Sequence, residues 1–293
     1  SFAFGGTNAS IIFSKNEHNA PAYKKEPIAV TGFGKLAGPS VELTAEGFNA
    51  RGVKLGFYRK LDRFSQMQVL SGVDALRDAG FEITPENASM VGSIIGTADG
   101  PMAEISAFQK TVCEKGPAAG SAFSFPNTVY NAAGGHLSIF TGLKGYCATI
   151  ANGAQAGLQA VTTACMKLQN GTADVILTYG TDETSENIAA LYAALGKAEN
   201  LAEGSVTAVL ETQAHAKARG ARVYANVLGS ASLHEPAAYG SESTQKLLSR
   251  TLREACADAG VEEAKLGKIF YAATDAAQDV TAQIGNSRAC AAA

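Results

Sequence analysis

Short apolar segments that alternate with helix-like segments constrain the fold of this chain more than any other feature. Residues 145–150 have the pattern of a strand, and residues 153–168 have the pattern of a helix that follows it. A turn at Asn170-Gly171 then leads into a second apolar strand at residues 174–177. The alternation recurs along the chain, so the sequence predicts a layered α/β body.

The remaining segments extend this pattern. Residues 62–79 predict the clearest helix, because an apolar stripe recurs at three-residue steps and Gly80 supplies a left-handed stop. The stripe consists of Met67, Leu70, Val73 and Leu76. A strand at 28–31 runs into Gly-Phe-Gly at 32–34, which we interpret as a tight turn, because a nucleotide-binding loop needs a third glycine. The other expected elements are strands at 90–95, 206–210, 222–228 and 269–272, and helices at 133–143 and 245–259.

Composition and charge argue against several classes of protein. The chain has 293 residues, of which 46% are hydrophobic and 17% charged, and its net charge is −3. We therefore expect a globular body that binds neither nucleic acid nor membranes. No apolar run approaches the ~20 residues that a membrane helix requires, and the N-terminus lacks the basic region of a signal peptide.

Cysteines and histidines are scattered along the sequence without the spacing of a metal site. An odd, dispersed set of cysteines is typical of reduced thiols, so we expect a cytoplasmic protein with no metal and no cofactor. The residues are Cys113, Cys147, Cys165, Cys256, Cys290, His18, His136, His215 and His234.

Several of these side chains are expected to have no catalytic role. Cys165 lies near the end of its helix, on one face with Leu158, Val161 and Leu168, so we expect a buried thiol. We expect Cys147 to lie within a strand and to be buried in the protein core. His136 is expected to pack or cap, His215 to face solvent from a charged helix, and His234 to lie in a loop.

The turn between the strand at 145–150 and the next helix carries Ala154 and Gln155. A nucleophile at such a turn would gain from the positive end of the helix, which lowers the pKa of a thiol. Alanine has no nucleophilic atom, and the amide of glutamine is not a useful one. The sequence therefore predicts the setting of a nucleophile without the nucleophile.

Several motifs, in order and with near-normal spacing, resemble those of one enzyme family. They are LDRF at 61–64, FPN at 125–127, AGGHLSI at 133–139, LKG at 143–145, the strand and turn at 171–183, GSVTAVL at 204–210 and HAKARGA at 215–221. From residue 28 to about 273, the chain resembles the β-ketoacyl-ACP synthases of the thiolase superfamily. The resemblance implies a duplicated five-layer αβαβα fold, usually dimeric, whose second half is incomplete in this chain.

The resemblance also implies how the chain is divided. Residues 1–15 are similar to a loop and strand from the C-terminal end of a synthase, and residues 16–27 form a linker. Residues 28–293 form a ketosynthase-like body, with an N-terminal half at 28–211 and a partial C-terminal half at 212–293.

The chemistry of the family implies that this site is degenerate. In active members, a cysteine takes the acyl chain from an acyl carrier protein, and two histidines promote decarboxylation of malonyl-ACP. The resemblance places Ala154 at the nucleophile, or Gln155 if the alignment slips by one residue. It places Ala273 and Asn286 at the two histidines. We therefore expect all three catalytic side chains to be replaced and no catalytic residue to be present.

The N-terminal residues resemble a loop from the opposite end of the family's chain. Phe4, Gly5 and Gly6 match the glycine-rich loop that supplies one of two N–H groups to the developing oxyanion. The chain could be a piece of a fused polyprotein that begins with the tail of an upstream synthase. It could instead be permuted, or the sequence could omit segments. We favour the first and third explanations, because a permutation would still have to supply missing strands. In the first case, Phe4 belongs to an active neighbour.

Three hypotheses for function follow. The first is a non-catalytic subunit akin to a chain length factor, in which a glutamine replaces the nucleophile. It would pair with an active ketosynthase as a heterodimer, or with a copy of itself, and work with an acyl carrier protein. The second is a malonyl-ACP decarboxylase whose enolate is stabilised by Gln155. The third is an ordinary active synthase seen as a partial chain. For Gln155 itself, an amide with no duty stays equally open.

Overall fold

The computed structural model of this chain describes residues 26–37, 43–196, 201–234, 242–272 and 289–292. The chain divides into two compact units, Ser1–Asn226 and Val227–Ala293. The expected N-terminal loop at 1–15 and nearly all of the expected linker at 16–27 lie outside the described residues. The expected division of the body at 211 and 212 stays a prediction.

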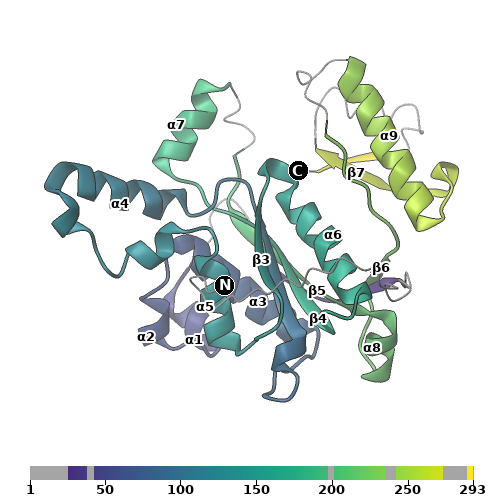
Figure 1. Cartoon of the computed structure of the whole chain (residues 1–293), viewed down its shortest axis with the longest axis horizontal. Helices are drawn as coiled ribbons and strands as arrows, with labels where there is room; N and C mark the ends of the chain where they lie inside the picture. Colours follow the sequence, from purple (N-terminus) through teal and green to yellow (C-terminus); the bar gives the residue numbers. More distant parts are fainter. Residues whose placement is uncertain (1–25, 38–42, 197–200, 235–241, 273–288, 293) are drawn as a thin grey trace, which may run out of the picture. The chain divides into compact units, whose positions relative to one another are not determined.

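A six-stranded sheet forms the body of the first unit (Figure 1). In spatial order its strands are β3 (Cys147–Ala151), β2 (Val91–Thr97), β4 (Val175–Asp182), β5 (Gly204–Thr212), β1 (Ile28–Ala37) and β6 (Ala225–Val227). β2 pairs in parallel with β3 and β4, whereas β5 pairs antiparallel with β4 and β1. The carboxyl ends of β2, β3 and β4 therefore lie at the same end of the sheet, where α/β proteins bind their ligands.

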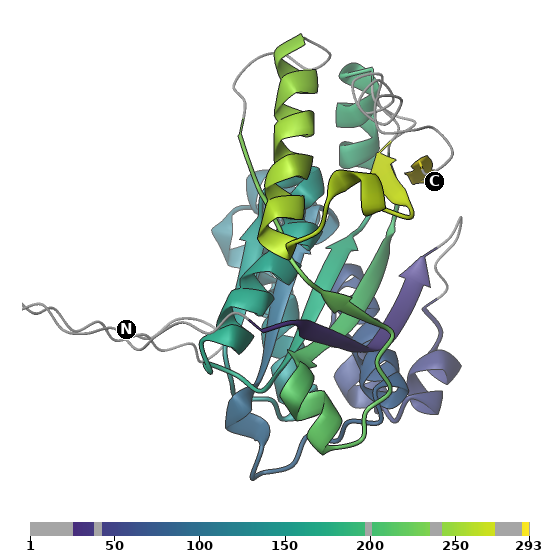
Figure 2. The ribbon, with the colours of Figure 1, turned by 90° about the vertical axis from the view of Figure 1, so that its right-hand side faces the viewer.

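Helices cover both faces of this sheet (Figures 1 and 2). The helices of this unit are α1 (Ala45–Ala50), α2 (Leu55–Tyr58), α3 (Arg63–Asp78), α4 (Met102–Lys115), α5 (Ala132–Thr141), α6 (Ala156–Gln169), α7 (Glu186–Ala194) and α8 (Gln213–Ala218), of which α4 and α7 project away from the sheet. Successive residues of β4 point to opposite faces of the sheet, so their contacts show which helix lies on which face. Tyr179 contacts Gly72 of α3, whereas Gly180, the next residue, meets Gly157 of α6. Thus α3 and α5 lie on one face and α6 on the other.

The strongest sequence signals are confirmed. α3 begins after Asp62, whose carboxylate accepts a hydrogen bond from the Ser65 N–H, and the chain leaves it through Gly80 at φ 56°. Met67, Leu70 and Val73 of the predicted stripe are buried, and Leu76 is half-buried. The helices expected at 133–143 and 153–168 are present as α5 and α6.

Other elements were missed or misplaced. The pattern predicted no helix at α1, α2, α4 or α7, because α1 and α2 are short and α4 has no buried residue to form a stripe. α7 buries only Ile188 among its side chains. The strand predicted at 222–228 is shorter and covers Ala225–Val227.

The interpretation of residues 32–34 as a tight turn is wrong. They lie inside β1, where the pairing register with β5 shifts between Val30 and Gly32. A Cβ on Gly32 would lie 2.5 Å from the carbonyl oxygen of Ala75, and a Cβ on Gly34 would lie 1.9 Å from that of Ser71. These glycines therefore let the backbone of α3 rest directly on β1.

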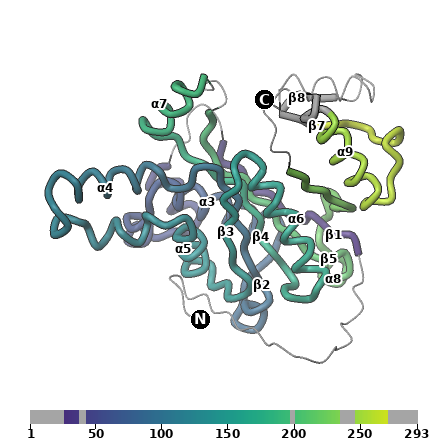
Figure 3. The backbone as a smooth tube through the Cα atoms, turned by 45° about the horizontal axis from the view of Figure 1, so that its top comes forward, coloured from purple at the N-terminus to yellow at the C-terminus, as the bar shows by residue number. Residues whose placement is uncertain are grey.

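The second unit holds a helix and a two-stranded sheet (Figure 3). Its elements are α9 (Glu242–Ala259), a one-turn 3-10 helix (Glu263–Lys265), β7 (Ile269–Ala272) and β8 (Ala289–Ala292). β7 and β8 pair in parallel. β7 has the predicted bounds, and α9 begins three residues before the predicted start at residue 245. Across the described part of the chain, no helix combines the length and apolarity needed to cross a membrane.

Replacing Gly34 with alanine should lower the free energy of unfolding by about 1–3 kcal/mol, the usual cost of overpacking a tight interior. The added Cβ would meet a backbone oxygen of α3, which cannot swing away as a side chain could. Urea unfolding measures the change. Gly56→Ala on α2 is the control, because a Cβ there meets nothing within 4 Å. Equal stability of the two variants would contradict close packing of α3 on β1.

Candidate functional site

The turn that follows β3 has a defined backbone path. Asn152 has φ −142° and ψ 47°, and Gly153 has φ 61°, a left-handed value that favours glycine. Gly153–Gln155 then form one turn of 3-10 helix before α6 begins. Ala154 and Gln155 both lie on this turn and are exposed to solvent. The structure thus brings these two predicted site residues together at the start of a helix.

Three glycines hold the start of α6 against the sheet. A Cβ on Gly96 of β2 would lie 2.2 Å from the carbonyl oxygen of Ala156. A Cβ on Gly157 would lie 3.3 Å from the Cα of Gly180 on β4. The first turn of α6 therefore lies at the carboxyl ends of the parallel strands, and its free N–H groups give Ala154 a positively polarised surrounding.

Gln155 occupies the N-cap position of α6, but its side chain makes no capping hydrogen bond. The neighbouring amide of Asn152 is engaged instead, since its Nδ2 donates to Gln159 Oε1 at 2.8 Å. The exposed amide of Gln155 therefore does not stabilise the helix end. It is accessible to a ligand or a partner. Both interpretations from the sequence, a functional amide and an amide with no role, therefore fit the structure.

A polar cluster at the carboxyl ends of β2 and β4 was missed by the sequence analysis. The Asp182 carboxylate accepts hydrogen bonds from Thr97 Oγ1 at 2.6 Å and from the backbone N–H groups of Ala98 and Asp99 at 2.9 and 3.0 Å. Burial raises the pKa of Asp182, although these hydrogen bonds oppose the rise. The Tyr192 hydroxyl of α7 donates to Asp99 Oδ2 at 3.1 Å. The only sequence signal for this cluster was an acidic residue at the end of a strand.

Neither part of this cluster can replace a thiol. The Asp182 carboxylate is held in place by hydrogen bonds from Thr97, Ala98 and Asp99, most of them to its Oδ1. Burial, followed by the negative charge of Asp99, raises the pKa of Tyr192, and the phenol stays protonated at neutral pH. The arrangement can orient a polar group, but it lacks an activated nucleophile.

None of the cysteines whose side chains are described lies at the turn with Ala154. Cys165 is buried on α6, and burial raises the pKa of its thiol to about 11, so it stays protonated and inert. Cys147 is half-buried at the beginning of β3, whereas the turn follows the end of that strand, and its Sγ lies 3.0 Å from Ser93 Oγ. Cys113 is exposed on α4, and Cys256 is buried in the second unit. The expected burial of Cys165 is confirmed, whereas Cys147 lies in its strand as expected but is half-buried and not in the core.

The helix face proposed for Cys165 is wrong. Leu158 was expected to share the buried face, but it is 75% exposed. The residues that α6 buries beside Cys165 are mostly alanines: Ala156, Ala160 and Ala164, followed by Leu168. Small side chains face the sheet because the glycines of β2 and β4 bring the helix close.

Two of the described histidines, His136 and His215, make polar contacts within the protein. His136 Nε2 donates to Asn127 Oδ1 at 2.7 Å, and burial lowers the pKa of the ring, as expected for a packed side chain. His234 lies in an exposed loop, as predicted. The expectation that His215 faces solvent is wrong, because its Nδ1 lies 2.6 Å from Glu211 Oε2. Glu211 is fully buried on β5 and also binds Arg219, which explains why α8 turns toward the sheet.

The remaining predicted site residues cannot be placed. Ala273, Asn286, Phe4, Gly5 and Gly6 all lie outside the described residues. Their correspondence to two histidines and an oxyanion loop stays a prediction. Within the described ranges, no three or more histidine, cysteine or acidic side chains gather in a way that could hold a metal ion.

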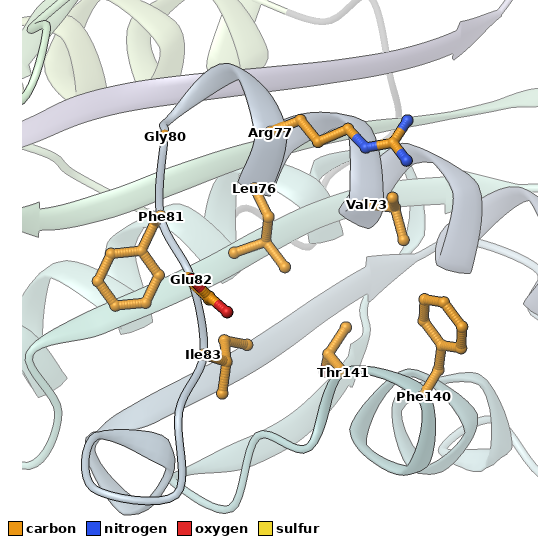
Figure 4. A pocket seen from close by; sticks show the side chains of 9 residues that line it. All are labelled: Val73, Leu76, Arg77, Gly80, Phe81, Glu82, Ile83, Phe140 and Thr141. Carbon is orange, nitrogen blue, oxygen red and sulfur yellow. The ribbon is translucent and has the colours of Figure 1, made fainter. Parts of the chain in front are cut away.

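A pocket of about 440 Å³ lies away from this turn (Figure 4). Its walls come from the end of α3, the segment at residues 80–83 and the end of α5, including Arg77 and Phe140. These segments lead into β2 and β3, so the pocket lies at the amino ends of those strands. It is therefore at the other end of the sheet from Ala154 and does not belong to the candidate site.

Alkylation of thiols in the native protein should distinguish the exposed turn at residue 154 from the buried position of Cys165. Iodoacetamide at neutral pH should leave Cys165 unmodified until the protein unfolds, because its thiol is buried and protonated. In an Ala154→Cys variant, the new thiol should be alkylated faster than Cys165 by at least about tenfold, since a helix start favours the thiolate. Peptide mapping by mass spectrometry gives both rates. Equal rates at the two positions would contradict the exposed, polarised geometry of the turn.

Comparison with known proteins shows the family of the chain. Residues 44–208, more than half of the chain, match the family described as "Beta-ketoacyl synthase, N-terminal domain". One curated relative is the 3-oxoacyl-[acyl-carrier-protein] synthase 2 of Vibrio harveyi, 33% identical over 192 residues, which cover 58% of this chain and 46% of the relative. The chain thus spans about half the length of the curated relatives that it matches most strongly.

Solved structures show the same fold at low identity. A β-ketoacyl synthase from Burkholderia phymatum STM815 matches with a TM-score of 0.75 at 19% identity, covering 90% of this chain and 78% of that one. A type II PKS acyl-carrier protein in complex with its ketosynthase bound to the hexaketide matches with a TM-score of 0.72 at 19% identity, over 90% and 79%. The ishigamide ketosynthase/chain length factor matches with 0.70 at 19%, over 90% and 82%.

The predicted fold class is confirmed by these matches: the chain has a thiolase-like α/β fold and covers part of it. The match at residues 44–208 contains the turn with Ala154 and the parallel strands β2, β3 and β4. On this evidence, the chain belongs to the β-ketoacyl synthase family.

Proposed function

We propose that this chain is a ketosynthase-like subunit of fatty acid or polyketide synthesis that has no condensing activity of its own. It acts like a chain length factor, beside an active β-ketoacyl-ACP synthase. The observation that carries the proposal is Ala154, which stands at the start of α6 where an acyl-accepting thiol would gain most from the helix.

The chemistry of acyl transfer explains why this single position matters. A thioester donor passes its acyl group only to a nucleophile, and the methyl group of alanine offers no lone pair. The preset N–H groups at the start of α6 could stabilise a developing negative charge, but they cannot accept the acyl group. A folded site without a nucleophile suits a subunit that shapes a chain-binding surface for a catalytic partner.

The partner set follows from the family and from two of the structural matches. One matched structure contains an acyl-carrier protein with its ketosynthase, and another contains a ketosynthase/chain length factor. We propose that this chain likewise meets an acyl carrier protein and pairs with a ketosynthase, either an active one or a second copy. A cytoplasmic location fits its scattered thiols and belongs to the same proposal.

The edge of the sheet is the surface that suits a ketosynthase-like partner. Among the described strands, β3 pairs on one side only, with β2, so its other edge is free. Exposed apolar side chains lie on both faces beside it: Leu158 on α6 is 75% exposed, and Ile139 on α5 is 73% exposed. Phe123 is 78% exposed, and a pocket of about 210 Å³ opens beside it at the segment with Phe125.

A second candidate function rests on Gln155. Its amide is exposed and makes no capping bond, so it is available to stabilise an enolate, as a malonyl-ACP decarboxylase requires. This activity needs no acyl-accepting thiol. It would prime a chain without extending it, so it is distinguishable from condensation by its product.

Reconstitution tests the main proposal. The chain is mixed with an active ketosynthase, acyl carrier protein and malonyl-ACP, and condensed products are measured by mass spectrometry. Products should form with the partner's cysteine and be lost when that cysteine is changed to alanine, because this chain supplies no nucleophile. Condensation by this chain alone would refute the proposal. Loss of CO2 without condensation, abolished in Gln155→Ala, would instead establish the decarboxylase.

The surface beside the free edge of β3, with Ile139 and Leu158, gives a separate prediction. The double variant Ile139→Asp with Leu158→Asp should shift the assembly toward monomer by at least about tenfold in dissociation constant, because charges would have to lose water in an apolar contact. Light scattering coupled to size-exclusion chromatography measures the shift, for this chain alone and with its partner. Leu55→Asp on α2, at a side chain 45% exposed, is the matched control. An unchanged mass in the double variant would exclude this face.

A further inference from the structure

The segments that continue the chain past the parallel strands carry acids and no bases. Counted from the last residue of each strand, they are residues 97–109 after β2, 151–166 after β3 and 182–196 after β4. Together they contain five acidic residues and no lysine, arginine or histidine. The acids are Asp99, Glu104, Asp182, Glu183 and Glu186. Because the carboxyl ends of parallel strands lie at one end of a sheet, these acids gather at the end that holds Ala154.

Asp99 belongs to the loop beside the turn. Thr97 pairs with Ala151 in the register of β2 and β3. Asp99 follows the first of these residues by two positions, and Ala154 follows the second by three. β2 also contacts the 3-10 turn that carries Ala154. The loop with Asp99 and the turn with Ala154 are therefore neighbours at the end of the sheet.

Two hydrogen bonds hold Asp99 in place. Its backbone N–H donates to Asp182 Oδ1 at 3.0 Å, and its side-chain Oδ2 accepts from the Tyr192 hydroxyl at 3.1 Å. Neither partner is a cation, so these bonds fix the carboxylate without neutralising it. The side chain is half-buried, so water and salt screen its charge less than they screen a charge on the open surface.

Two fields of opposite sign act at the turn. The start of α6 is equivalent to about half a positive charge, and its effect falls off within the first turn of the helix. The Asp99 carboxylate carries a full negative charge, which acts over about 8 Å at physiological salt. A charge that develops on an atom at the turn itself is therefore stabilised by the helix. A carboxylate carried a few bonds further along a ligand lies beyond the reach of the helix and meets the acids.

We propose that this turn admits acyl chains that carry no charge and rejects acyl groups that carry a free carboxylate, with Asp99 as the residue that selects between them. Acetyl and longer neutral chains belong to the admitted class, whereas malonyl groups belong to the rejected class. The inference rests on the function proposed above, because it concerns the acyl chain that this site would meet there. It also weighs against decarboxylation at Gln155, which requires a malonyl group.

Two alkylating reagents of similar size measure the field at the turn. Iodoacetamide is neutral and iodoacetate is an anion, and both modify the thiol of an Ala154→Cys variant. Peptide mapping by mass spectrometry gives the two rates in the folded chain and, as a reference, in urea. At low ionic strength, the ratio of the iodoacetamide rate to the iodoacetate rate should be at least about threefold higher in the folded chain, and added salt should reduce it.

Asp99→Asn in the same background should lower this ratio by at least about twofold, toward the value in urea. The asparagine oxygen still accepts a hydrogen bond from Tyr192, so the variant removes the charge and keeps the contact. Glu46→Gln removes the same charge from an exposed position on α1 and should leave the ratio unchanged. If the ratio in the folded chain is no higher than in urea, or if Asp99→Asn and Glu46→Gln behave alike, the proposal is wrong.

Binding to the parent chain tests the selection with the acyl groups themselves. The probes are the acetyl and malonyl thioesters of N-acetylcysteamine, and saturation-transfer NMR measures their dissociation constants. The acetyl probe should bind at least about threefold more tightly, and Asp99→Asn should narrow the difference. Equal or tighter binding of the malonyl probe would overturn the proposal. Neither measurement involves condensation, so the selection of acyl groups and the function proposed above can fail separately.

Discussion

The close contact between the first turn of α6 and the strands beneath it determines where the candidate site lies and which side chains α6 can bury. Gly96, Gly157 and Gly180 remove the side chains that would hold the helix away, so backbone lies against backbone. The consequence extends along the helix, where alanines rather than larger residues face the sheet. This close approach fixes the 3-10 turn at the carboxyl ends of the parallel strands. It also fixes Ala154, because the residues before and after it are anchored.

The backbone at the start of α6 and the side chain at residue 154 are set by different parts of the sequence. A helix start with free N–H groups is a feature of the backbone, so it persists whatever side chain occupies the turn. The thiol is a property of one side chain, and here that side chain is a methyl group. Fold and activity are therefore separable in principle, because the first belongs to the backbone and the second to a single side chain.

Sequence patterns predicted the elements whose signals are local. Asp62 and Gly80 bracket α3 because capping and left-handed stops depend on a few adjacent residues. The glycines of β1 were misinterpreted because their reason is the distant backbone of α3, which no local pattern reveals. Leu158 was placed on the wrong face because apolar spacing does not show that a close sheet prefers alanine.

The candidate site was predictable only in part, for the same reason. Its position followed from the strand, the turn and the motifs around them, and the structure places Ala154 and Gln155 there. The polar cluster of Asp99, Asp182 and Tyr192 depends on strands and a helix that meet in space, so no distinctive local pattern marks it. His215 was misplaced because its partner, Glu211, is a buried acid on a neighbouring strand whose need for cations is visible only in three dimensions.

Acylation of the chain itself is the most direct measurement. The purified protein is incubated with an acyl carrier protein that carries an acyl thioester, and separately with a cerulenin-type inhibitor. Intact mass and peptide mapping then report any covalent adduct. Every sulfur of the chain should stay unmodified at stoichiometric level. A thioester or inhibitor adduct on any cysteine, removable by hydroxylamine in the first case, would contradict it.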